Sequence, residues 1–363
     1  MSDRPVPRPG ISNIRGHMIA TGEDQSPDGI FIASNESVYG PGEMAREAIV
    51  RSADTVERYP DDGTLRLADA IGARFSIDPS RICCGFGSDD LLARLARAYL
   101  SPGDELIHSV HGYPKIPNYA YANDAVPVSA GDRDFTADVD SILKCLTDRT
   151  RIVMLANPDN PAGTYLNGAE VRRLHENLGP EMLLVLDSAY TEYVSAPDYE
   201  DPLGLIESAD NVVMTRTFSK VFGLAGLRVG WACGPEEVME SLKRIGITFP
   251  ISVTALAACE ASLEDRSHFE MVIRENCRIR SMFSEALLGF GLKVIPSQTN
   301  FVLVRFPNRQ LATDAHAALE AERIYARRLA GGDFAECVRF TMGTEEEMRR
   351  CVEVTKEWLK RNV

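Results

Sequence analysis

The sequence alternates short, almost wholly apolar runs with longer helical patterns. The apolar runs cover residues 81–84, 105–110, 151–156, 182–186, 211–215 and 227–233. A strand that is apolar along its whole length is buried on both faces, and intervening helices return the chain for parallel pairing. We therefore predict an α/β fold, in which a mainly parallel sheet is sandwiched by helices.

The pattern changes after about residue 260. A long charged helix is predicted over about residues 267–288, and short strands and a terminal amphipathic helix follow it. This order is typical of an α+β unit. We predict a large domain over residues 41–260 and a smaller α+β domain over residues 261–363. The N-terminal arm, residues 1–40, is expected to complete the smaller domain.

Composition narrows the class of function. The formal net charge of −14 argues against a sequence-independent nucleic-acid binder, which needs a cationic face. The eight cysteines are scattered, without a C-x-x-C pair or a cysteine–histidine cluster, so no metal site is expected. Neither a secretory signal nor a membrane-spanning run is found. We expect a cytoplasmic protein that acts on small molecules and binds neither nucleic acid nor membrane.

Lys220 carries the strongest chemical signal in the chain. It follows Thr217 and Ser219 and precedes a glycine-rich run that leads to Arg228. A lysine amine can form a Schiff base with an aldehyde, while hydroxyl groups and a guanidinium hold a phosphate. The segment therefore suits a pyridoxal phosphate site. The alternative is an ordinary lysine on a helix face.

Three polar segments fall just past the carboxyl ends of predicted strands, at Asn157, Asp187 and Thr217. Ligands of open α/β sheets bind at this edge, so the segments are expected to converge on one crevice. An unpaired carboxylate at Asp187 would be costly, and a protonated ring nitrogen would compensate it. Tyr190 and Asn160 can hydrogen-bond a ring hydroxyl. Alternatively, these residues form a helix cap, a packed aromatic and an Asn-Pro turn.

Further anion sites are predicted on both sides of this crevice. Residues 85–88 precede a helix and can present backbone N–H groups to a phosphate, although a tight turn is the alternative. The run is not a dinucleotide fingerprint, because Asp90 stands where the third glycine is required. Arg339 lies inside an apolar strand, where a substrate anion or an internal salt bridge would pair with it. Arg327 and Arg328 form a basic pair that is either functional or merely exposed.

Taken in order, these segments resemble the fold-type I pyridoxal-phosphate aminotransferases, and most of all the histidinol-phosphate aminotransferase family. The similarity runs from about Arg8 to Trp358. The motifs that carry it are Asn35-Glu36-Ser37-Val38-Tyr39-Gly40-Pro41, Tyr59-Pro60-Asp61 with Leu65-Arg66, Thr217-Phe218-Ser219-Lys220 through Arg228, Asn300-Phe301, and Arg339-Phe340-Thr341-Met342-Gly343-Thr344.

The resemblance implies a role for each matched cofactor residue. Lys220 is the implied Schiff-base lysine and the base of the proton transfer, and Asp187 is the implied partner of the ring nitrogen. Tyr190 and Asn160 are assigned to the ring hydroxyl. The phosphate is assigned to Ser88, Ser219 and Arg228, with Gly87, Asp89 and Thr217 in the same cofactor site and Tyr59 reaching in from the partner subunit.

Substrate contacts follow from the same resemblance. Arg339 is expected to bind the carboxylate of glutamate, together with Asn160, while Tyr39 and Arg327 help to bind a distal phosphate. The residue that stacks on the cofactor ring is assigned to His111, and Tyr113 is a close rival.

The resemblance therefore predicts a homodimer with a shared active site that transfers an amino group from L-histidinol phosphate to 2-oxoglutarate. The nearest alternative is an aminotransferase for aromatic amino acids. A decarboxylase acting on a phosphorylated amino acid and a non-catalytic, cofactor-binding regulator are further alternatives.

Overall fold

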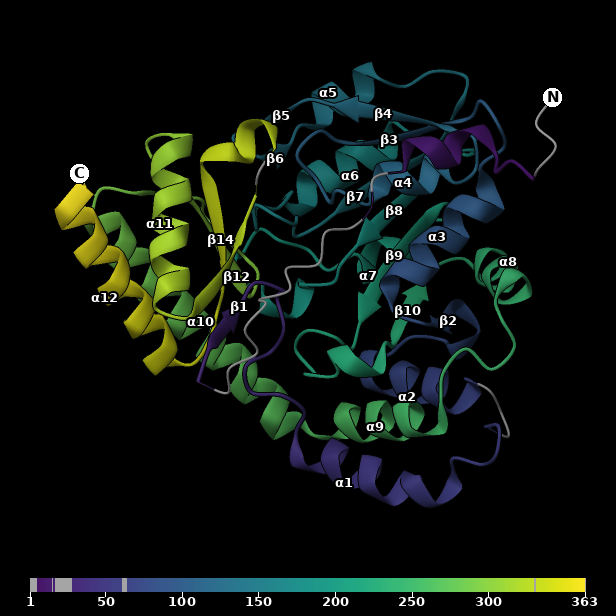
Figure 1. Ribbon diagram of the computed structural model, residues 1–363. Coiled ribbons are helices and arrows are strands. Elements are labelled where there is room, and N and C mark those ends of the chain that lie inside the picture. Colours follow the sequence, from purple (N-terminus) through teal and green to yellow (C-terminus); the bar gives the residue numbers. More distant parts are fainter. Residues whose placement is uncertain (1–4, 15, 17–27, 61–63, 330, 363) are drawn as a thin grey trace.

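The chain folds around two β-sheets that lie side by side (Figure 1). The computed structural model describes residues 5–14, 16, 28–60, 64–329 and 331–362. We refer to the seven-stranded sheet and the helices packed on it as the large part. The five-stranded sheet and its helices form the small part.

The large sheet has the strand order β2-β10-β9-β8-β7-β3-β4. Its strands are β2 (Ile82–Gly85), β3 (Glu105–Ser109), β4 (Val126–Ala130), β7 (Thr150–Ala156), β8 (Leu183–Asp187), β9 (Val212–Thr217) and β10 (Gly230–Cys233). Strand β10 runs antiparallel to both of its neighbours, β2 and β9, and the other described pairs of this sheet are parallel. All residues of β3, β8 and β9 are buried, because helices cover both faces. The predicted mainly parallel sheet between helices is confirmed.

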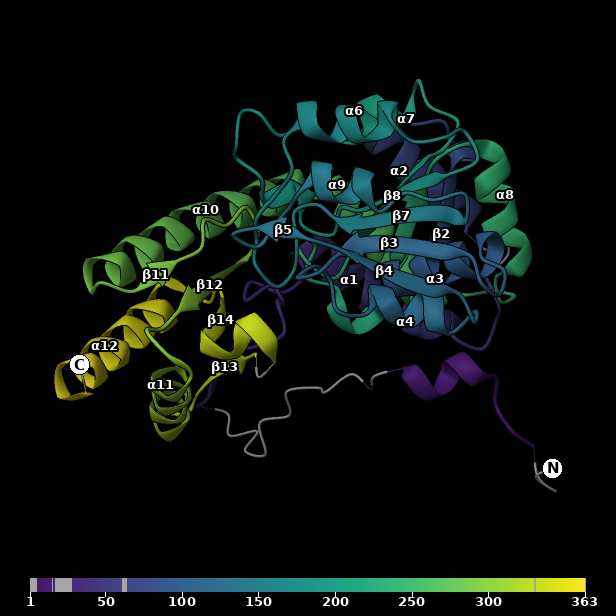
Figure 2. The ribbon, with the colours of Figure 1, turned by 90° about the horizontal axis from the view of Figure 1, so that it is seen from above.

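Helices pack on both faces of this sheet (Figure 2). The helices of the large part are α1 (Glu43–Ser52), α2 (Leu65–Phe75), α3 (Ser88–Tyr99), α4 (Ile116–Tyr121), α5 (Val139–Lys144), α6 (Gly168–Glu176), α7 (Leu203–Ile206), α8 (Glu236–Ile245) and α9 (Val253–Glu264). One apolar core lies under α3, α4 and α8, and another lies under α2, α6 and α9. Helix α1 packs on the outside of α9.

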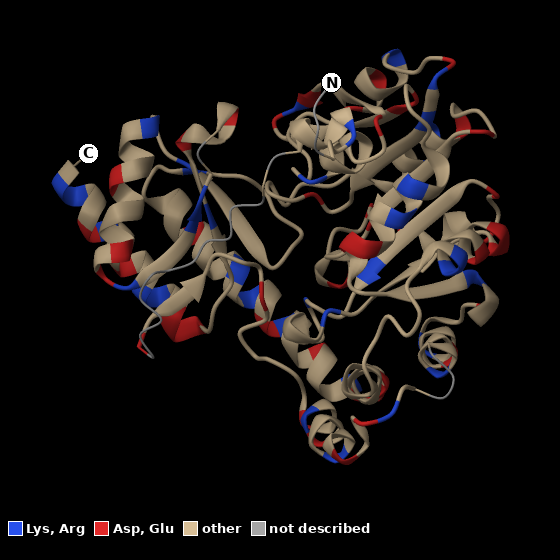
Figure 3. Cartoon of the chain, turned by 45° about the vertical axis from the view of Figure 1, so that its right-hand side comes forward, with Lys and Arg blue, Asp and Glu red and all other residues tan. Residues whose placement is uncertain are grey.

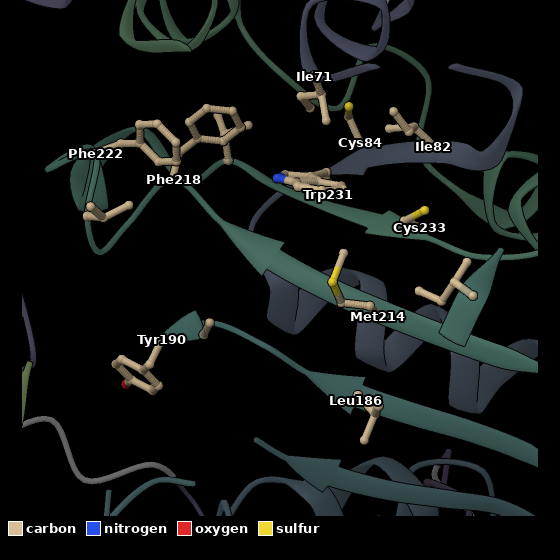
Figure 4. Packing of buried hydrophobic residues seen from close by; sticks show 14 of the residues in the cluster. Ile71, Ile82, Cys84, Leu186, Tyr190, Met214, Phe218, Phe222, Trp231 and Cys233 are labelled. Atoms are coloured by element: carbon tan, nitrogen blue, oxygen red, sulfur yellow. The ribbon is translucent and has the colours of Figure 1, made fainter. Parts of the chain in front are cut away.

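Large side chains hold the strands of the large sheet together. Trp231 of β10, Met214 of β9 and Leu186 of β8 belong to one buried cluster (Figure 4). Full burial of side chains of this size contributes about 1.5–3 kcal/mol each. Because β10 is antiparallel, its first residue, Gly230, lies opposite Thr217, the last residue of β9. Residues far apart in sequence therefore meet at one edge of the sheet.

The small part contains a sheet with the order β1-β13-β14-β12-β11. Its strands are β1 (Ile30–Ile32), β11 (Lys293–Val294), β12 (Phe301–Arg305), β13 (Ile324–Arg328) and β14 (Cys337–Thr341), and its helices are α10 (Arg266–Gly289), α11 (Arg309–Ala321) and α12 (Glu345–Asn362). A separate apolar cluster fills the space between them. The long helix predicted over about 267–288 corresponds to α10. The domain boundary near residue 260 stays a prediction.

The N-terminal arm contacts both parts. Strand β1 pairs in parallel with β13 and completes the small sheet. The 3₁₀ helix η1 (Pro9–Asn13) instead packs against α4 of the large part, where the Gly10 N–H donates to Asp124 Oδ1 at 2.7 Å. A short hairpin of β5 (Asp132–Arg133) and β6 (Thr136–Ala137) approaches the small part from the large part (Figure 1).

Acidic and basic residues are interleaved over the helices of both parts (Figure 3). Many of these charges form ion pairs, such as that of Arg278 with Glu345 between α10 and α12. Among the described helices, none is both long and apolar enough to cross a membrane.

Candidate active site

A cavity of about 1050 Å³ opens where β7, β8 and β9 end, and it extends to strands β13 and β14 of the small part. Most of the predicted site residues line it: Ser88, Asp89, His111, Tyr113, Asn160, Asp187, Tyr190, Thr217, Ser219, Lys220, Arg228, Arg327 and Arg339. Of the three residues expected to converge on this crevice, Asp187 and Thr217 line it. Asn157 does not, because its side-chain amide bonds to the backbone of Leu166 instead.

Lys220 follows β9 and lies partly buried in this cavity. Its Nζ is 3.5 Å from the carbonyl oxygen of Ser34 and 5.6 Å from the centroid of the Tyr190 ring. Burial, aided by the positive charge of Arg339, lowers the pKa of Lys220 to about 8. The neutral, nucleophilic form of the amine is therefore accessible near neutral pH.

Asp187 is the last residue of β8 and is buried. Its Oδ1 accepts a hydrogen bond from the Thr215 hydroxyl at 2.9 Å. Burial raises the pKa of Asp187 to about 7, although this bond opposes the shift. A carboxyl group in this state gains from a cationic partner, which would favour its ionised form.

Tyr190 lies between the large and small parts, and its hydroxyl oxygen accepts two amide hydrogen bonds. Asn35 Nδ2 donates to it at 3.0 Å and Asn160 Nδ2 at 3.3 Å. Burial raises the pKa of Tyr190 to about 12, so the phenol stays protonated. A role for Asn35 could not be predicted from the residues around it. The motif that begins at Asn35 resembles the family as a whole segment, without singling out this side chain.

Helix α3 and the loop before β10 form the end of the cavity that suits a phosphate. Gly87 precedes α3 with φ +80°, and a Cβ there would lie 2.7 Å from Nη2 of Arg228. Arg228 Nη1 donates to the Ser219 hydroxyl at 3.1 Å. The N-terminal N–H groups of α3 and this guanidinium together suit an anion. Gly87 itself is not among the residues that line the cavity.

Asp89 anchors a group of side chains at the same end. Its carboxylate accepts hydrogen bonds from Lys115 Nζ at 2.6 Å, from the Tyr119 hydroxyl at 2.7 Å and from the Tyr113 hydroxyl at 3.1 Å. Although burial opposes it, the bond from Lys115 keeps the pKa of Asp89 below its ordinary value. The charge fixes Tyr113, whose own pKa is raised by burial and by Asp89 and Asp187.

Arg339 reaches the cavity from β14, and no acidic side chain among the described residues pairs with it. Its Nη1 donates to Asn160 Oδ1 at 2.6 Å and its Nη2 to the Ala33 carbonyl at 2.7 Å, while Nε is buried without a partner. Burial lowers the pKa of Arg339 to about 10, so the guanidinium remains charged. Arg327 of β13 lies opposite it in the sheet. Two neighbouring cations favour an anionic ligand.

Besides Gly87, two predicted residues lie outside the cavity lining. Tyr59 is 76% exposed and stacks on Phe249, with ring centroids 4.6 Å apart. Tyr39 packs against the core of the large part, and burial raises its pKa. Within this chain, the structure does not bring either ring to Lys220. Asp61 of the matched Tyr59-Pro60-Asp61 motif lies outside the described residues.

The chain is similar in sequence to known aminotransferases. Residues 27–354 match the family model described as aminotransferase class I and II. The chain is 45% identical to a histidinol-phosphate aminotransferase of Paramagnetospirillum magneticum, over 98% of this chain and 99% of that protein. It is 44% identical to one of Rhodospirillum centenum, over the same shares.

Solved structures show the same similarity. A histidinol-phosphate aminotransferase from Sinorhizobium meliloti, solved in complex with pyridoxal-5'-phosphate, superposes with a TM-score of 0.87 at 27% identity, over 92% of each chain. An aspartate aminotransferase mutant of Thermus thermophilus, at 22% identity, superposes with a TM-score of 0.79 over 91% of this chain and 96% of its own. At this identity the second similarity concerns the fold alone.

Proposed function

The chain belongs to the aminotransferase class I and II family, and we propose that it transfers the amino group of L-histidinol phosphate to 2-oxoglutarate with pyridoxal 5'-phosphate as cofactor. The relatives named for this activity align over nearly the whole chain. The single observation that carries the proposal is the cavity in which Lys220, Asp187 and Arg339 meet.

The residues of the cavity fit pyridoxal phosphate at both of its ends. Asp187 is buried with a raised pKa, which a protonated ring nitrogen would relieve. At the other end, a Cβ on Gly87 would fill the space beside Arg228, so the backbone and the guanidinium already form a cradle for a phosphate. Ser88, Ser219 and Arg228 would hold that phosphate, and Asn160 and Tyr190 the ring hydroxyl.

When bound, the cofactor supplies an electron sink for the bonds at the amino-bearing carbon of the substrate. Lys220 presents Nζ as the amine that holds the cofactor and, in its neutral form, as the base that moves the substrate proton. Its lowered pKa keeps a useful fraction of that form near neutral pH. Asp187 keeps the ring nitrogen protonated, and Tyr190 keeps a hydrogen-bond donor at the ring hydroxyl.

We infer that Tyr113, and not His111, stacks on the cofactor ring. The Tyr113 hydroxyl is fixed by Asp89 at 3.1 Å, and Tyr113 lines the cavity together with Asp187. His111 is instead held by two carboxylates, from Asp132 and Asp333, at the side of the cavity that faces the small part.

Substrate anions would bind at the arginines of the small part. Arg339 is placed to take the carboxylate of glutamate or 2-oxoglutarate, because its present partners are a neutral amide and a carbonyl. Arg327, opposite it on β13, would take the phosphate of L-histidinol phosphate. Tyr39 lies outside the cavity of this chain, so its expected help with the phosphate depends on the assembly.

We also propose that the protein is a homodimer in which Tyr59 completes the site of the partner. Tyr59 stacks on Phe249, and both rings are exposed, as are other large apolar side chains of the large part: Val56, Leu65 and Ile247. Such a surface favours burial against another protein chain. The cytoplasmic location expected from the sequence remains part of this proposal.

The proposal is tested by the visible absorbance of the cofactor-loaded protein during titration with L-histidinol phosphate, without keto acid. Addition of the donor should bleach the absorbance band of the bound cofactor in the original protein. The same concentration of donor should leave the band of the Lys220→Ala protein unchanged. Lys243→Ala, which removes a surface lysine of α8, is the matched control and should behave as the original protein.

Two other outcomes separate the alternatives. If phenylalanine bleaches the band at lower concentration than L-histidinol phosphate, the donor is an aromatic amino acid. If a phosphorylated amino acid releases carbon dioxide without a keto acid, the protein is a decarboxylase. Failure of the protein to bind the cofactor at all refutes the proposal as a whole.

A further inference from the structure

A cluster of charged side chains joins the two parts of the molecule beside the cavity. His111, in the loop after β3, has Nδ1 2.7 Å from Asp132 Oδ2 and Nε2 2.9 Å from Asp333 Oδ2. Asp132 belongs to β5 of the large part, and Asp333 belongs to helix η6 (Gly332–Glu336), which connects β13 and β14 in the small part. A neutral imidazole has one N–H, so both nitrogens donate only when the ring is protonated.

Aromatic packing holds the same junction. Phe135 of the β5–β6 turn and Phe334 of η6 stack with centroids 4.9 Å apart, and His111 meets each ring edge-on at 5.1 Å. Phe135 has φ +63°, which a bulky residue rarely adopts. Its side chain shares a buried cluster with residues of β12 and β14 in the small part. The unusual turn is therefore maintained by contacts between the two parts.

Helix η6 is well placed to influence the site. It connects the strands that carry Arg327 and Arg339, and both arginines line the cavity. Asn160 and Lys220 face them from the large part. A bond between η6 and the large part therefore limits how far the two arginines can move away from the reacting groups.

We propose that His111 is a positioning residue that, as an imidazolium, clips η6 to the large part and holds Arg327 and Arg339 in position for an anionic substrate. The effect on the substrate rests on the proposed function. The clip itself does not, because it is made by residues of this chain alone.

The charged groups around the ring are acidic. Asp132 faces it from β5 and Asp333 from η6. Asp159, in the loop after β7, is buried, and burial together with the charge of Asp132 raises its pKa and favours its neutral form. Nearby, Lys293 of β11 pairs with Asp134 of the β5–β6 turn at 3.2 Å. This second link between the parts is carried by a lysine and does not involve His111.

The clip is tested by amide hydrogen exchange of segment 332–336 in the purified protein between about pH 5 and 8, corrected for the intrinsic pH dependence of exchange. Asp333 is 75% exposed, so the bond is expected to be modest, and protection should fall by about two- to fivefold as the pH rises. Asp333→Asn should abolish the fall, while Asp333→Glu should retain it. Glu346→Gln, an exposed acid of α12, is the control.

The positioning role is tested by kinetics over the same pH range. The KM for the anionic donor should rise by about two- to fivefold with pH while kcat changes less, and Asp333→Asn should show the higher KM throughout. The clip is refuted if protection in the original protein does not depend on pH, or if Asp333→Asn keeps the same dependence. If exchange behaves as expected but KM does not, the positioning role is wrong. Absence of any transamination refutes the proposed function and leaves the exchange result standing.

Discussion

Arg339 and Arg327 are predicted to divide two anionic substrates between them. Glutamate presents a carboxylate next to its amino-bearing carbon, whereas L-histidinol phosphate has a phosphate ester in its place. Arg339 is buried and has no acidic partner among the described residues, and Arg327 lies opposite it on β13. We expect Arg339→Gln to impair the reaction of glutamate more than that of L-histidinol phosphate, and Arg327→Gln to do the reverse.

The size of each effect follows from burial. A hydrogen bond to a charged group contributes about 1.5–3 kcal/mol, and about 1.4 kcal/mol corresponds to a factor of ten. For the buried Arg339, this predicts about a 10- to 150-fold loss in kcat/KM for glutamate. Arg327 is only half-buried, so solvent screening reduces its contribution to about 0.5–1.5 kcal/mol, or about two- to twelvefold.

The assay is a single-turnover measurement of each half-reaction, in which the absorbance of the bound cofactor is followed with glutamate or with L-histidinol phosphate alone. The informative quantity is the ratio of the two kcat/KM values in each variant. Arg349→Gln is the control, because Arg349 is an exposed arginine of α12 that pairs with Glu345. Cofactor content is measured beforehand, so that loss of cofactor is not mistaken for loss of substrate binding.

The reasoning is refuted if Arg339→Gln lowers both values by the same factor, because the guanidinium would then not distinguish the two anions. It is also refuted if Arg327→Gln affects glutamate more strongly than L-histidinol phosphate. A large loss in the Arg349→Gln control would show that general destabilisation, and not the site, determines the result.

Three further predictions concern the cofactor site and the proposed dimer. In Gly230→Ala, the added Cβ would overlap the backbone nitrogen of Ser88. The affinity for the cofactor should therefore fall by at least about tenfold, and the free energy of unfolding by about 1–3 kcal/mol. Gly204 has open space around it, so Gly204→Ala should change neither quantity. The pKa of Lys220 is lowered to about 8, so the fraction of its neutral, nucleophilic form increases as the pH rises. The rate of cofactor uptake by the apoprotein should therefore increase through about pH 8 and then level off. A stopped-flow rate that does not change with pH would contradict this. Tyr59→Ala and Lys220→Ala proteins should each be poorly active, and subunit exchange between them should restore activity; no recovery would argue against a shared site.

The central sheet and the core of the site could be predicted because the physics is local in sequence. Strands buried on both faces read as apolar runs, and Asp187 and Thr217 mark the points where two of them end. Parallel pairing then brings those residues to one edge. The antiparallel direction of β10 gave no such local signal, because an apolar run does not encode its orientation.

Other features depend on contacts that no local pattern announces. Asn35 reaches Tyr190 across 155 positions of sequence, and only the meeting of the two sheets brings them together. The β5–β6 turn has Phe135 at positive φ, where glycine or asparagine is the usual signal. Its conformation is maintained by packing against the small part, so the turn and the His111 junction could not be predicted from the sequence.

The pairing of β1 with β13 determines when the protein can be completed during synthesis. Ile30 leaves the ribosome early, but its partner is Ile324, and translation at about 5–20 residues per second separates the two by about 15–60 s. Ala33, Ser34 and Asn35, which line the cavity, directly follow β1. The large sheet can therefore form while this strand still lacks its template, and the cavity becomes complete only near the end of translation.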